Sequence, residues 1–149
     1  MNQIKRVEIH EFSHTAKNLG LLTNANTIGA VGYAKGKSIK LDKYAVVIET
    51  KDGCRGEYVT HWGGNQVACA QSKMLAPKLL EYNANEREKI YDDFKRELRQ
   101  FDHMGHGPLD IALWDWAGKK LNCSIGMLLG SYRKKLPAYA STYHGDRNG

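Results

Sequence analysis

The segment 109–117 constrains the fold most, because it reads Leu-Asp-Ile-Ala-Leu-Trp-Asp-Trp-Ala and is apolar on nearly every side of a helix. Gly107 and Pro108 precede it, and proline is tolerated at the first helical position. A helix that is hydrophobic all round lies in the interior, between other layers. Trp114 and Trp116 stand two residues apart, so they face different sides of this helix and are expected to pack against different partners.

Three strands are expected in the first part of the chain. Residues 5–10 alternate, with Val7 and Ile9 facing one way and charged side chains facing the other. Residues 44–50 are rich in β-branched side chains, and residues 55–60 return after an Asp-Gly pair that suits a type I′ turn. These segments predict a three-stranded antiparallel sheet.

A stretch from about residue 16 to 41 separates the first strand from this hairpin and is interpreted as one long loop, because glycines interrupt it. Loops of this length in a compact domain are usually functional or mobile. Its apolar side chains argue against a solvated linker, so the loop is expected to cover something. Gly36-Lys37-Ser38 resembles the end of a phosphate-binding loop, but Val31 stands where that motif needs glycine, so a flexible basic loop is expected.

Helices are expected in the second half. The first runs over residues 65–76 and is ended or kinked by Pro77. The second begins at Asn85, which caps it together with Glu88 in a capping box. An apolar stripe on this second helix consists of Ile90, Phe94, Leu98 and Phe101.

A short helix is expected at residues 125–129, after the one that opens with Gly107 and Pro108. Strands followed by helices define an α+β fold, here a three-stranded antiparallel sheet followed by a helical bundle. Residues 136–143 then read as a further strand. That strand must either pair with the early sheet or belong to a part of the protein outside this chain.

The charge balance raises the hypothesis of nucleic-acid binding, since the formal net charge is +6 and the pI is about 9.2. The basic residues, however, are interspersed with acidic ones, as in residues 86–97. No run of 18 apolar residues exists, so a membrane span is not expected. The N-terminal sequence has no apolar signal region, and a cytoplasmic protein is expected.

The cysteines and histidines offer few metal ligands by pattern. Cys54, Cys69 and Cys123 are far apart and form no C-x-x-C pair, so partly buried reduced thiols are expected. His103 and His106 lack further ligands nearby and are interpreted as exposed turn histidines. For residues 61–65, His-Trp-Gly-Gly-Asn, an anion-binding turn and a plain strand–helix turn both stay open.

The helix at residues 109–117 and the segments after it resemble the corresponding sequences of a known family. Residues 110–119 (DIALWDWAGK), 128–130 (LLG) and 136–141 (LPAYAS) resemble the end of the N-terminal domain of the mandelate racemase/muconate lactonizing enzyme family, in the enolase superfamily. The order of strands, long loop, hairpin and helices agrees with that domain throughout the chain. Ser131, where a second glycine is usual, and Ser124-Ile125, where a proline often stands, are modest departures.

The resemblance implies that residues 1–133 are a capping domain and that residues 134–149 begin a TIM-type barrel whose remainder lies beyond Gly149. In that family the barrel holds a divalent metal ion, usually Mg²⁺, on three carboxylates, together with the groups that take the proton α to a substrate carboxylate. Catalytic and metal-binding residues are therefore expected to lie outside this chain. The implied partners are the barrel, a small carboxylate or hydroxy-acid substrate and further copies in a homo-oligomer.

The resemblance also implies substrate-contacting residues. The long loop is expected to close over the barrel mouth and the turn at residue 61 to form a second wall. The end of strand 136–143 is expected at the catalytic face. The candidates for contact with the substrate are Leu21, Leu22, Ile28, Tyr33, His61, Trp62, Ser141 and Tyr143.

The expected activity is dehydration of a sugar acid or a related hydroxy acid, or else racemisation, epimerisation or cycloisomerisation of a carboxylate. Two rivals stay open. One is a stand-alone α+β binding module, and the other is a basic nucleic-acid-binding domain.

Overall fold

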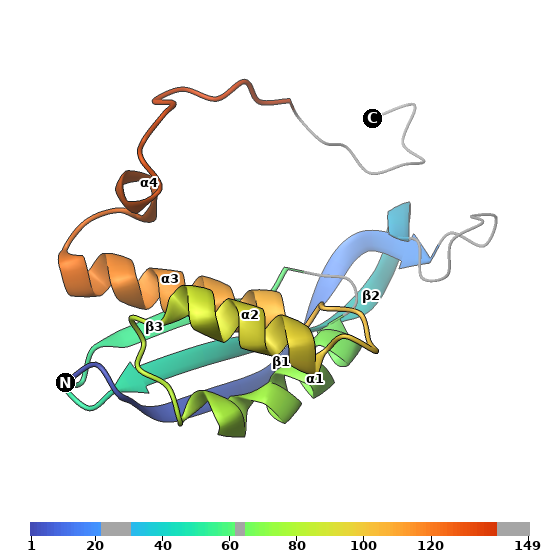
Figure 1. Cartoon of the computed structure of the whole chain (residues 1–149). Coiled ribbons are helices and arrows are strands. Elements are labelled where there is room, and N and C mark those ends of the chain that lie inside the picture. The colour runs from blue at the N-terminus through green and yellow to red at the C-terminus, as the bar shows by residue number, and fades with distance from the viewer. Residues whose placement is uncertain (22–30, 62–64, 140–149) are drawn as a thin grey trace. The chain divides into compact units, whose positions relative to one another are not determined.

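A computed structural model describes residues 1–21, 31–61 and 65–139. Its elements, in chain order, are β1 (Ile4–Leu21), β2 (Val31–Thr50), β3 (Arg55–Val59), α1 (Asn65–Leu79), α2 (Arg87–Glu97), α3 (His106–Leu121) and α4 (Ile125–Leu128) (Figure 1). The chain divides into two compact units. The core unit comprises residues 1–12 and 42–132, and the hairpin unit comprises residues 13–41 and 133–149.

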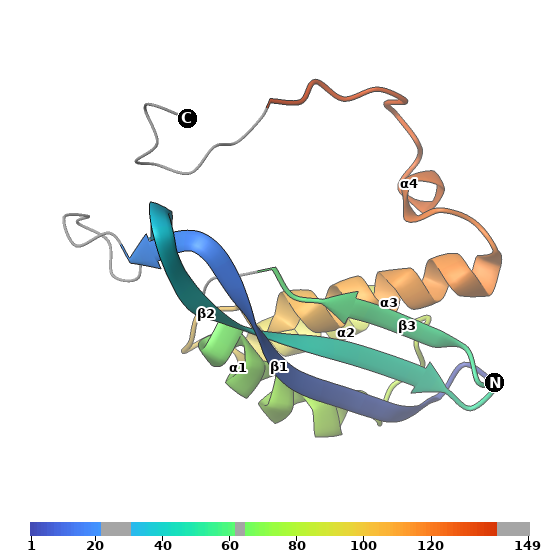
Figure 2. The same ribbon diagram turned by 180° about the vertical axis from the view of Figure 1, so that it is seen from behind.

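The sheet has the strand order β1-β2-β3, which confirms the predicted α+β fold with three strands. β2 and β3 are antiparallel, in a register that runs from Ala45 opposite Val59 to Glu49 opposite Arg55. In the core unit, α1, α2 and α3 cover one face of the strands (Figure 1), and Figure 2 shows the strands from the other side. None of the described helices is long and apolar enough to cross a membrane.

The turn between β2 and β3 differs from the predicted type I′ turn. Within it only Gly53 has a positive φ, at 85°. The Gly53 N–H donates to Thr50 O at 2.8 Å, and the Thr50 N–H donates to Cys54 O at 3.0 Å. The loop therefore has three residues, a type I turn followed by a left-handed glycine. The Asp52 carboxylate accepts from the Thr50 hydroxyl at 2.6 Å, which favours this turn over the two-residue form.

The hairpin unit corrects the prediction of a long loop over residues 16–41. In its described part, residues 16–21 belong to β1 and residues 31–41 belong to β2. The predicted flexible loop at residues 36–38 is also strand. The loop prediction rested on the glycines, but Gly36 lies inside β2 with a φ of 74°. Asn18 lies inside β1 with a φ of 57°, and its Oδ1 accepts from the Gly36 N–H at 3.0 Å.

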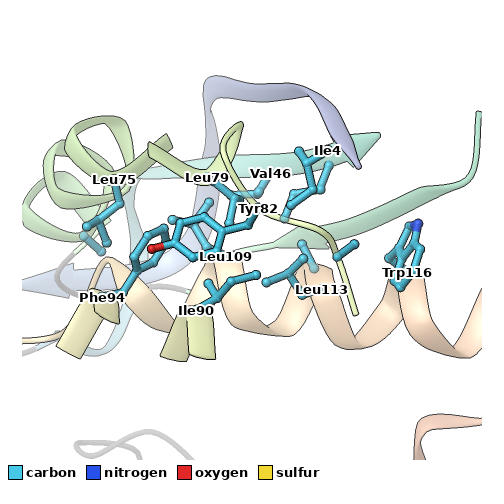
Figure 3. Packing of buried hydrophobic residues seen from close by; sticks show 14 of the residues in the cluster. Ile4, Val46, Leu75, Leu79, Tyr82, Ile90, Phe94, Leu109, Leu113 and Trp116 are labelled. Carbon is cyan, nitrogen blue, oxygen red and sulfur yellow. The ribbon is translucent and has the colours of Figure 1, made fainter. Parts of the chain in front are cut away.

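The core lies between the sheet and the helices. Ile4, Val46, Phe94, Leu109 and Leu113 are at most 2% exposed and pack together with the other side chains in Figure 3. The helix α3 lies directly on β3, and most of its apolar side chains are buried as predicted. Ile111 is 39% exposed, so the helix is not enclosed on every side as its sequence suggested.

The two tryptophans of α3 pack on different partners, as predicted. Trp116 is 1% exposed, and its Nε1 donates to Thr50 Oγ1 of the sheet at 3.0 Å. Trp114 is half-buried and lies 4.6 Å from the Arg87 guanidinium of α2.

Two helix boundaries differ from the predictions. α1 continues through Pro77 to Leu79, since the proline falls in the last turn, where few further helical bonds depend on it. α2 begins at Arg87 after Glu86, and the predicted capping box of Asn85 with Glu88 is absent. The Glu86 side chain instead accepts from the Asn83 N–H at 3.0 Å, so it belongs to a local turn and does not cap the helix.

The apolar stripe of α2 is shorter than predicted. Ile90, Phe94 and Leu98 are buried, but Phe101 is 57% exposed. The helix ends at Glu97, so Phe101 lies beyond the periodicity that would have turned it inward.

His106 is buried, which corrects its interpretation as an exposed turn residue. It is the first residue of α3 and is 5% exposed. Its ring lies 4.8 Å from that of Tyr91 and 5.9 Å from that of Phe94. The prediction missed this because α3 begins one residue earlier than Gly107, which places His106 on the face toward α2.

The C-terminal end of the described chain agrees with the prediction at the short helix α4 and differs from it at residues 136–139. α4 begins after Ser124, whose side chain accepts from the Met127 N–H at 3.2 Å. Residues 136–139, expected to open a strand, form neither helix nor strand. A strand requires a partner for its backbone groups, and the described sheet consists of β1, β2 and β3, which this segment does not join.

Candidate substrate-capping site

The junction between β3 and α1 holds His61, a predicted substrate contact. His61 is exposed and follows the last residues of β3. Asn65, the first residue of α1, donates through Nδ2 to His61 O at 2.7 Å and to Asp42 O at 2.6 Å. The side-chain amide of Asn65 therefore links the His61 backbone to α1 and to β2. The exposed His61 side chain extends from a main chain that these hydrogen bonds fix.

A buried polar network lies beneath this junction. Thr60 is 4% exposed, and its N–H and hydroxyl both donate to Tyr44 O, at 2.9 and 3.1 Å. The Tyr44 hydroxyl lies 3.0 Å from Ser72 Oγ, which donates to Gly105 O at 2.7 Å. Burial raises the pKa of Tyr44 above its ordinary value, so the phenol is neutral near pH 7. The network links the end of β3 to α1 and to the start of α3.

Gln71 completes this support from α1. Its Oε1 accepts from the Gly105 N–H at 2.8 Å, and its Nε2 donates to Asp102 O at 2.5 Å. A Cβ atom at Gly105 would lie 2.3 Å from Gln71 Cβ, so only glycine fits this close approach. Asn65 at a helix start is a residue type that sequence reasoning could have singled out. Thr60, Ser72 and Gln71 gave no such signal, because their partners are distant in sequence.

The hairpin unit holds Leu21 and Tyr33, two more of the predicted contacts. A Cβ atom at Gly20 would lie 3.1 Å from Ala34 Cβ, so β1 and β2 are side by side there. Leu21 and Tyr33 are the next residues along the two strands. Leu21 is 67% exposed and Tyr33 is half-buried. The hairpin thus carries one exposed aliphatic side chain and one partly exposed aromatic side chain.

Five predicted contacts lie outside the described residues. They are Leu22, Ile28, Trp62, Ser141 and Tyr143.

Two carboxylates of the core unit that lie on or next to the sheet, Glu49 and Asp52, form ion pairs with cations of the same chain. Glu49, 6% exposed, contacts Lys5, Arg6 and Arg55, and hydrogen bonds from the first two lower its pKa to about 2. Asp52 contacts Lys120, which holds the pKa of Asp52 well below its usual range. Within residues 1–21, 31–61 and 65–139, no three His, Cys, Asp or Glu side chains gather so that they could hold a metal ion. The described part of the chain therefore does not fit a magnesium site.

Comparison with known proteins finds a family and relatives that match most of the chain. The family model described as the N-terminal domain of mandelate racemase/muconate lactonizing enzyme matches residues 31–130. The chain is 32% identical over 113 residues to the 3,6-anhydro-alpha-L-galactonate cycloisomerase of Streptomyces coelicolor, a match that covers 70% of this chain and 31% of that protein. It is 27% identical to the L-talarate/galactarate dehydratase of Salmonella typhimurium, over 82% of this chain and 33% of that protein.

Solved structures show the same fold. The dipeptide epimerase of Enterococcus faecalis, complexed with Mg and a dipeptide, matches with a TM-score of 0.68 and 21% identity, over 87% of this chain and 35% of that one. The talarate/galactarate dehydratase structure gives a TM-score of 0.66 and 22% identity, over 87% of this chain and 33% of that one. The chain thus spans about a third of the length of these relatives.

The chain has a three-stranded sheet with helices on one face, and this α+β fold matches about a third of the length of these longer proteins. Since the family model covers most of its length, the chain belongs to the mandelate racemase/muconate lactonizing enzyme N-terminal domain family, in the enolase superfamily. The resemblance to this family is confirmed, and the matched range includes residues 110–119 and 128–130, whereas residues 136–141 lie beyond it.

Proposed function

We propose that this chain is the substrate-capping domain of a magnesium-dependent enolase-superfamily enzyme that removes the proton α to a carboxylate. The observation that carries the proposal is the match of residues 31–130 to the family's N-terminal domain. The curated relatives include a cycloisomerase of an anhydro-sugar acid and dehydratases of talarate, galactarate and arabinonate. A small hydroxy acid is therefore the proposed substrate, with dehydration favoured over racemisation, epimerisation or cycloisomerisation, and the cytoplasm is the proposed location.

The proposed partner is a C-terminal barrel domain of the same protein. Residues 1–133 form the cap in this proposal, and residues 134–149 begin the barrel. The ligands of Mg²⁺ and the acid and base groups are assigned to that barrel. When bound there, the ion supplies positive charge beside the substrate carboxylate and makes its α proton more acidic.

The role proposed for this chain's own residues is to exclude water and to shape the site. Leu21 and Tyr33 would contact the substrate from the hairpin unit, together with Leu22 and Ile28. His61 and Trp62 would form a second wall. Closing such walls strengthens every electrostatic interaction inside the site, because fewer water molecules screen it. The 67% exposure of Leu21 supports this role, since a leucine with so little contact in its own unit is available to a ligand.

Ser141 and Tyr143 are proposed as further substrate contacts, at the end of the first barrel strand. The reason is that active sites of TIM-type barrels lie at the C-terminal ends of their strands.

The pattern of ion pairs gives little support to the nucleic-acid alternative. Many lysines and arginines are paired with carboxylates of the same unit, including Lys5, Arg6, Lys73, Lys78, Arg96, Lys119 and Lys120. A phosphate backbone would have to compete with these carboxylates for each cation.

Exchange of the substrate α proton with solvent tests the proposal. The protein encoded by the complete gene is incubated in D₂O with a panel of sugar acids and Mg²⁺, and ¹H NMR follows the loss of each α-proton signal. We expect one or more acids to exchange or dehydrate, with loss of the activity in EDTA. The 149-residue chain alone is the matched control and is expected to be inactive. A complete protein inactive on every carboxylate tested, yet bound to DNA in a salt-dependent manner, would contradict the proposal.

A further inference from the structure

The charge of the chain is divided unequally between its two units. The core unit contains 14 lysines and arginines and 15 aspartates and glutamates, so it contributes almost nothing to the formal charge of +6. Residues 13–41 of the hairpin unit contain four lysines and no arginine, aspartate or glutamate. We name these four, Lys17, Lys35, Lys37 and Lys40, the hairpin lysines.

The hairpin lysines are exposed and unpaired. Lys17 lies on β1 and the other three lie on β2. None of them takes part in an ion pair among residues 1–21, 31–61 and 65–139, where the paired cations belong to the core unit. The acidic residues at the two ends of the hairpin contact α1 instead. Glu11 pairs with Lys73, and Asp42 Oδ2 accepts from Gln66 Nε2 at 3.3 Å.

The hairpin carries charge of one sign only. Lysines on exposed strands can hinder pairing with other chains, but that protection does not require a single sign. The first part of β1, in the core unit, carries Lys5, Arg6, Glu8 and Glu11 and thus both signs. Like charges repel one another, so four lysines without a carboxylate weaken the hairpin itself. The single sign therefore indicates an anionic ligand rather than protection alone.

The lysines of β2 lie close enough to act together. Residues of a strand are about 3.3 Å apart along its axis, so Lys35 and Lys37 are separated by about 7 Å. That distance is within the screening length of about 8 Å at physiological salt, so their electric fields add. β1 and β2 lie side by side (Figure 2), and a Cβ atom at Gly20 of β1 would lie 3.5 Å from Lys37 Cδ. The Lys37 side chain therefore extends over β1.

Lys35 shares a face of β2 with Tyr33. The two residues are two positions apart, and side chains alternate between the faces of a strand. Both precede Gly36, whose φ of 74° interrupts the alternation. Tyr33 is half-buried and is one of the substrate contacts proposed above. The Lys35 ammonium is therefore within reach of an anionic group on a ligand that contacts Tyr33.

We propose that the hairpin lysines make the complete enzyme select sugar acids with two carboxylates over those with one. This inference rests on the proposed function, in which the first carboxylate lies beside Mg²⁺ in the barrel. The second carboxylate is then drawn to the hairpin. A doubly charged acid gains about twice the attraction of a singly charged one in the same field. The lysines raise its local concentration at the site and so raise its kcat/KM.

Selectivity at two salt concentrations tests the proposal. The complete enzyme is assayed with Mg²⁺ on pairs of acids of one configuration, such as galactonate with galactarate and gluconate with glucarate. At an ionic strength of about 0.01 M we expect kcat/KM to favour the dicarboxylate by about tenfold or more. At about 0.1 M the preference is expected to fall severalfold, because the screening length shortens from about 30 Å to about 10 Å.

Neutralising the lysines of β2 tests their role directly. One variant carries Lys35→Gln, Lys37→Gln and Lys40→Gln. We expect its preference for the dicarboxylate to fall by about three- to tenfold, through KM rather than kcat, and its salt dependence to flatten. The matched control removes three exposed cations of the core unit and is expected to keep both properties. It carries Lys51→Gln, Lys89→Gln and Arg99→Gln.

Lys35→Gln alone keeps the test decisive should the triple variant fail to fold, because it removes only the lysine that shares a face with Tyr33. An active enzyme without a dicarboxylate preference overturns the inference and leaves the proposed function standing. A preference that the lysine variants leave unchanged, or that the core-unit control lowers equally, does the same. An enzyme inactive on every acid of both classes overturns the proposed function, and the inference with it.

Discussion

The indole Nε1 of Trp116 donates a hydrogen bond to Thr50 Oγ1 at 3.0 Å, and both side chains are fully buried. This bond joins α3 to the end of β2, next to the β2–β3 turn. The Thr50 hydroxyl in turn donates to Asp52, so one chain of hydrogen bonds fixes the helix, the strand and the turn together. Buried networks of this kind are stabilising only while each member keeps its partner.

Trp116→Phe is expected to lower the free energy of unfolding by about 1 to 3 kcal/mol. The substitution removes the donor to Thr50 and leaves a small void against β3. Urea denaturation followed by circular dichroism measures the change. Trp114→Phe is the control, because Trp114 is only half-buried and is expected to lose less. Equal losses in the two variants would show that the buried hydrogen bond contributes nothing.

Gly56→Ala is expected to destabilise the fold by about 3 kcal/mol or more. A Cβ atom at this position of β3 would lie 2.0 Å from Ala112 O, so α3 must move away from the sheet. Gly107→Ala is the control, because nothing lies within 4 Å of a Cβ atom there. That variant is expected to keep or gain stability, by no more than about 1 kcal/mol. Both are measured by urea denaturation, and a Gly56→Ala midpoint equal to the parent's contradicts the packing of α3 on β3.

The stability of the domain is expected to fall as the pH drops from about 5 to about 2, because of Glu49. The folded-state pKa of Glu49 is about 2, below the ordinary value of 4.5, since Lys5 and Arg6 stabilise its ionised form. A lowered carboxyl pKa gives stability that is present above the ordinary pKa and is lost as the pH falls through the folded one. Glu49→Gln should flatten this part of the profile. Glu81→Gln, an exposed site, should leave it unchanged.

His106 is expected to destabilise the fold below about pH 6.5. Burial, and to a smaller extent His103, lower the pKa of His106 below 6.5, so the folded state favours the neutral ring. A lowered histidine pKa gives stability that is complete above the ordinary value and is lost as the pH falls toward the folded one. NMR titration of the ring protons measures the pKa directly. His106→Phe should remove the loss of stability that begins below about pH 6.5, and an unchanged loss there would assign it to another group.

Much of the fold could be predicted from the sequence, because its signals are local. The alternation at residues 5–10 and the apolar run at 109–117 need only the periodicity of a strand or a helix. The family resemblance rested on the same run. The predictions that failed depend on distant partners: residues 16–21 and 31–41 become strands only because they pair with each other, and His106 is buried only because α2 lies against α3.

The candidate site could be predicted less well for the same reason. Sequence reasoning selected aromatic and aliphatic residues in segments that were expected to be loops or turns, such as His61 and Leu21. It could not foresee that Asn65 fixes the main chain at His61, since that bond also needs Asp42 from β2. Periodicity carries no information about which polar side chains meet across elements.

Substrate discrimination by the complete enzyme tests the central claim most directly. For two sugar acids of different length, we expect Leu21→Asn to change the ratio of the kcat/KM values by about tenfold or more, since a wall residue contacts one substrate more than the other. Val59→Asn is the control, because Val59 is similarly exposed, at 54%, but lies on β3. An unchanged ratio with Leu21→Asn, or the same change with Val59→Asn, contradicts the capping role.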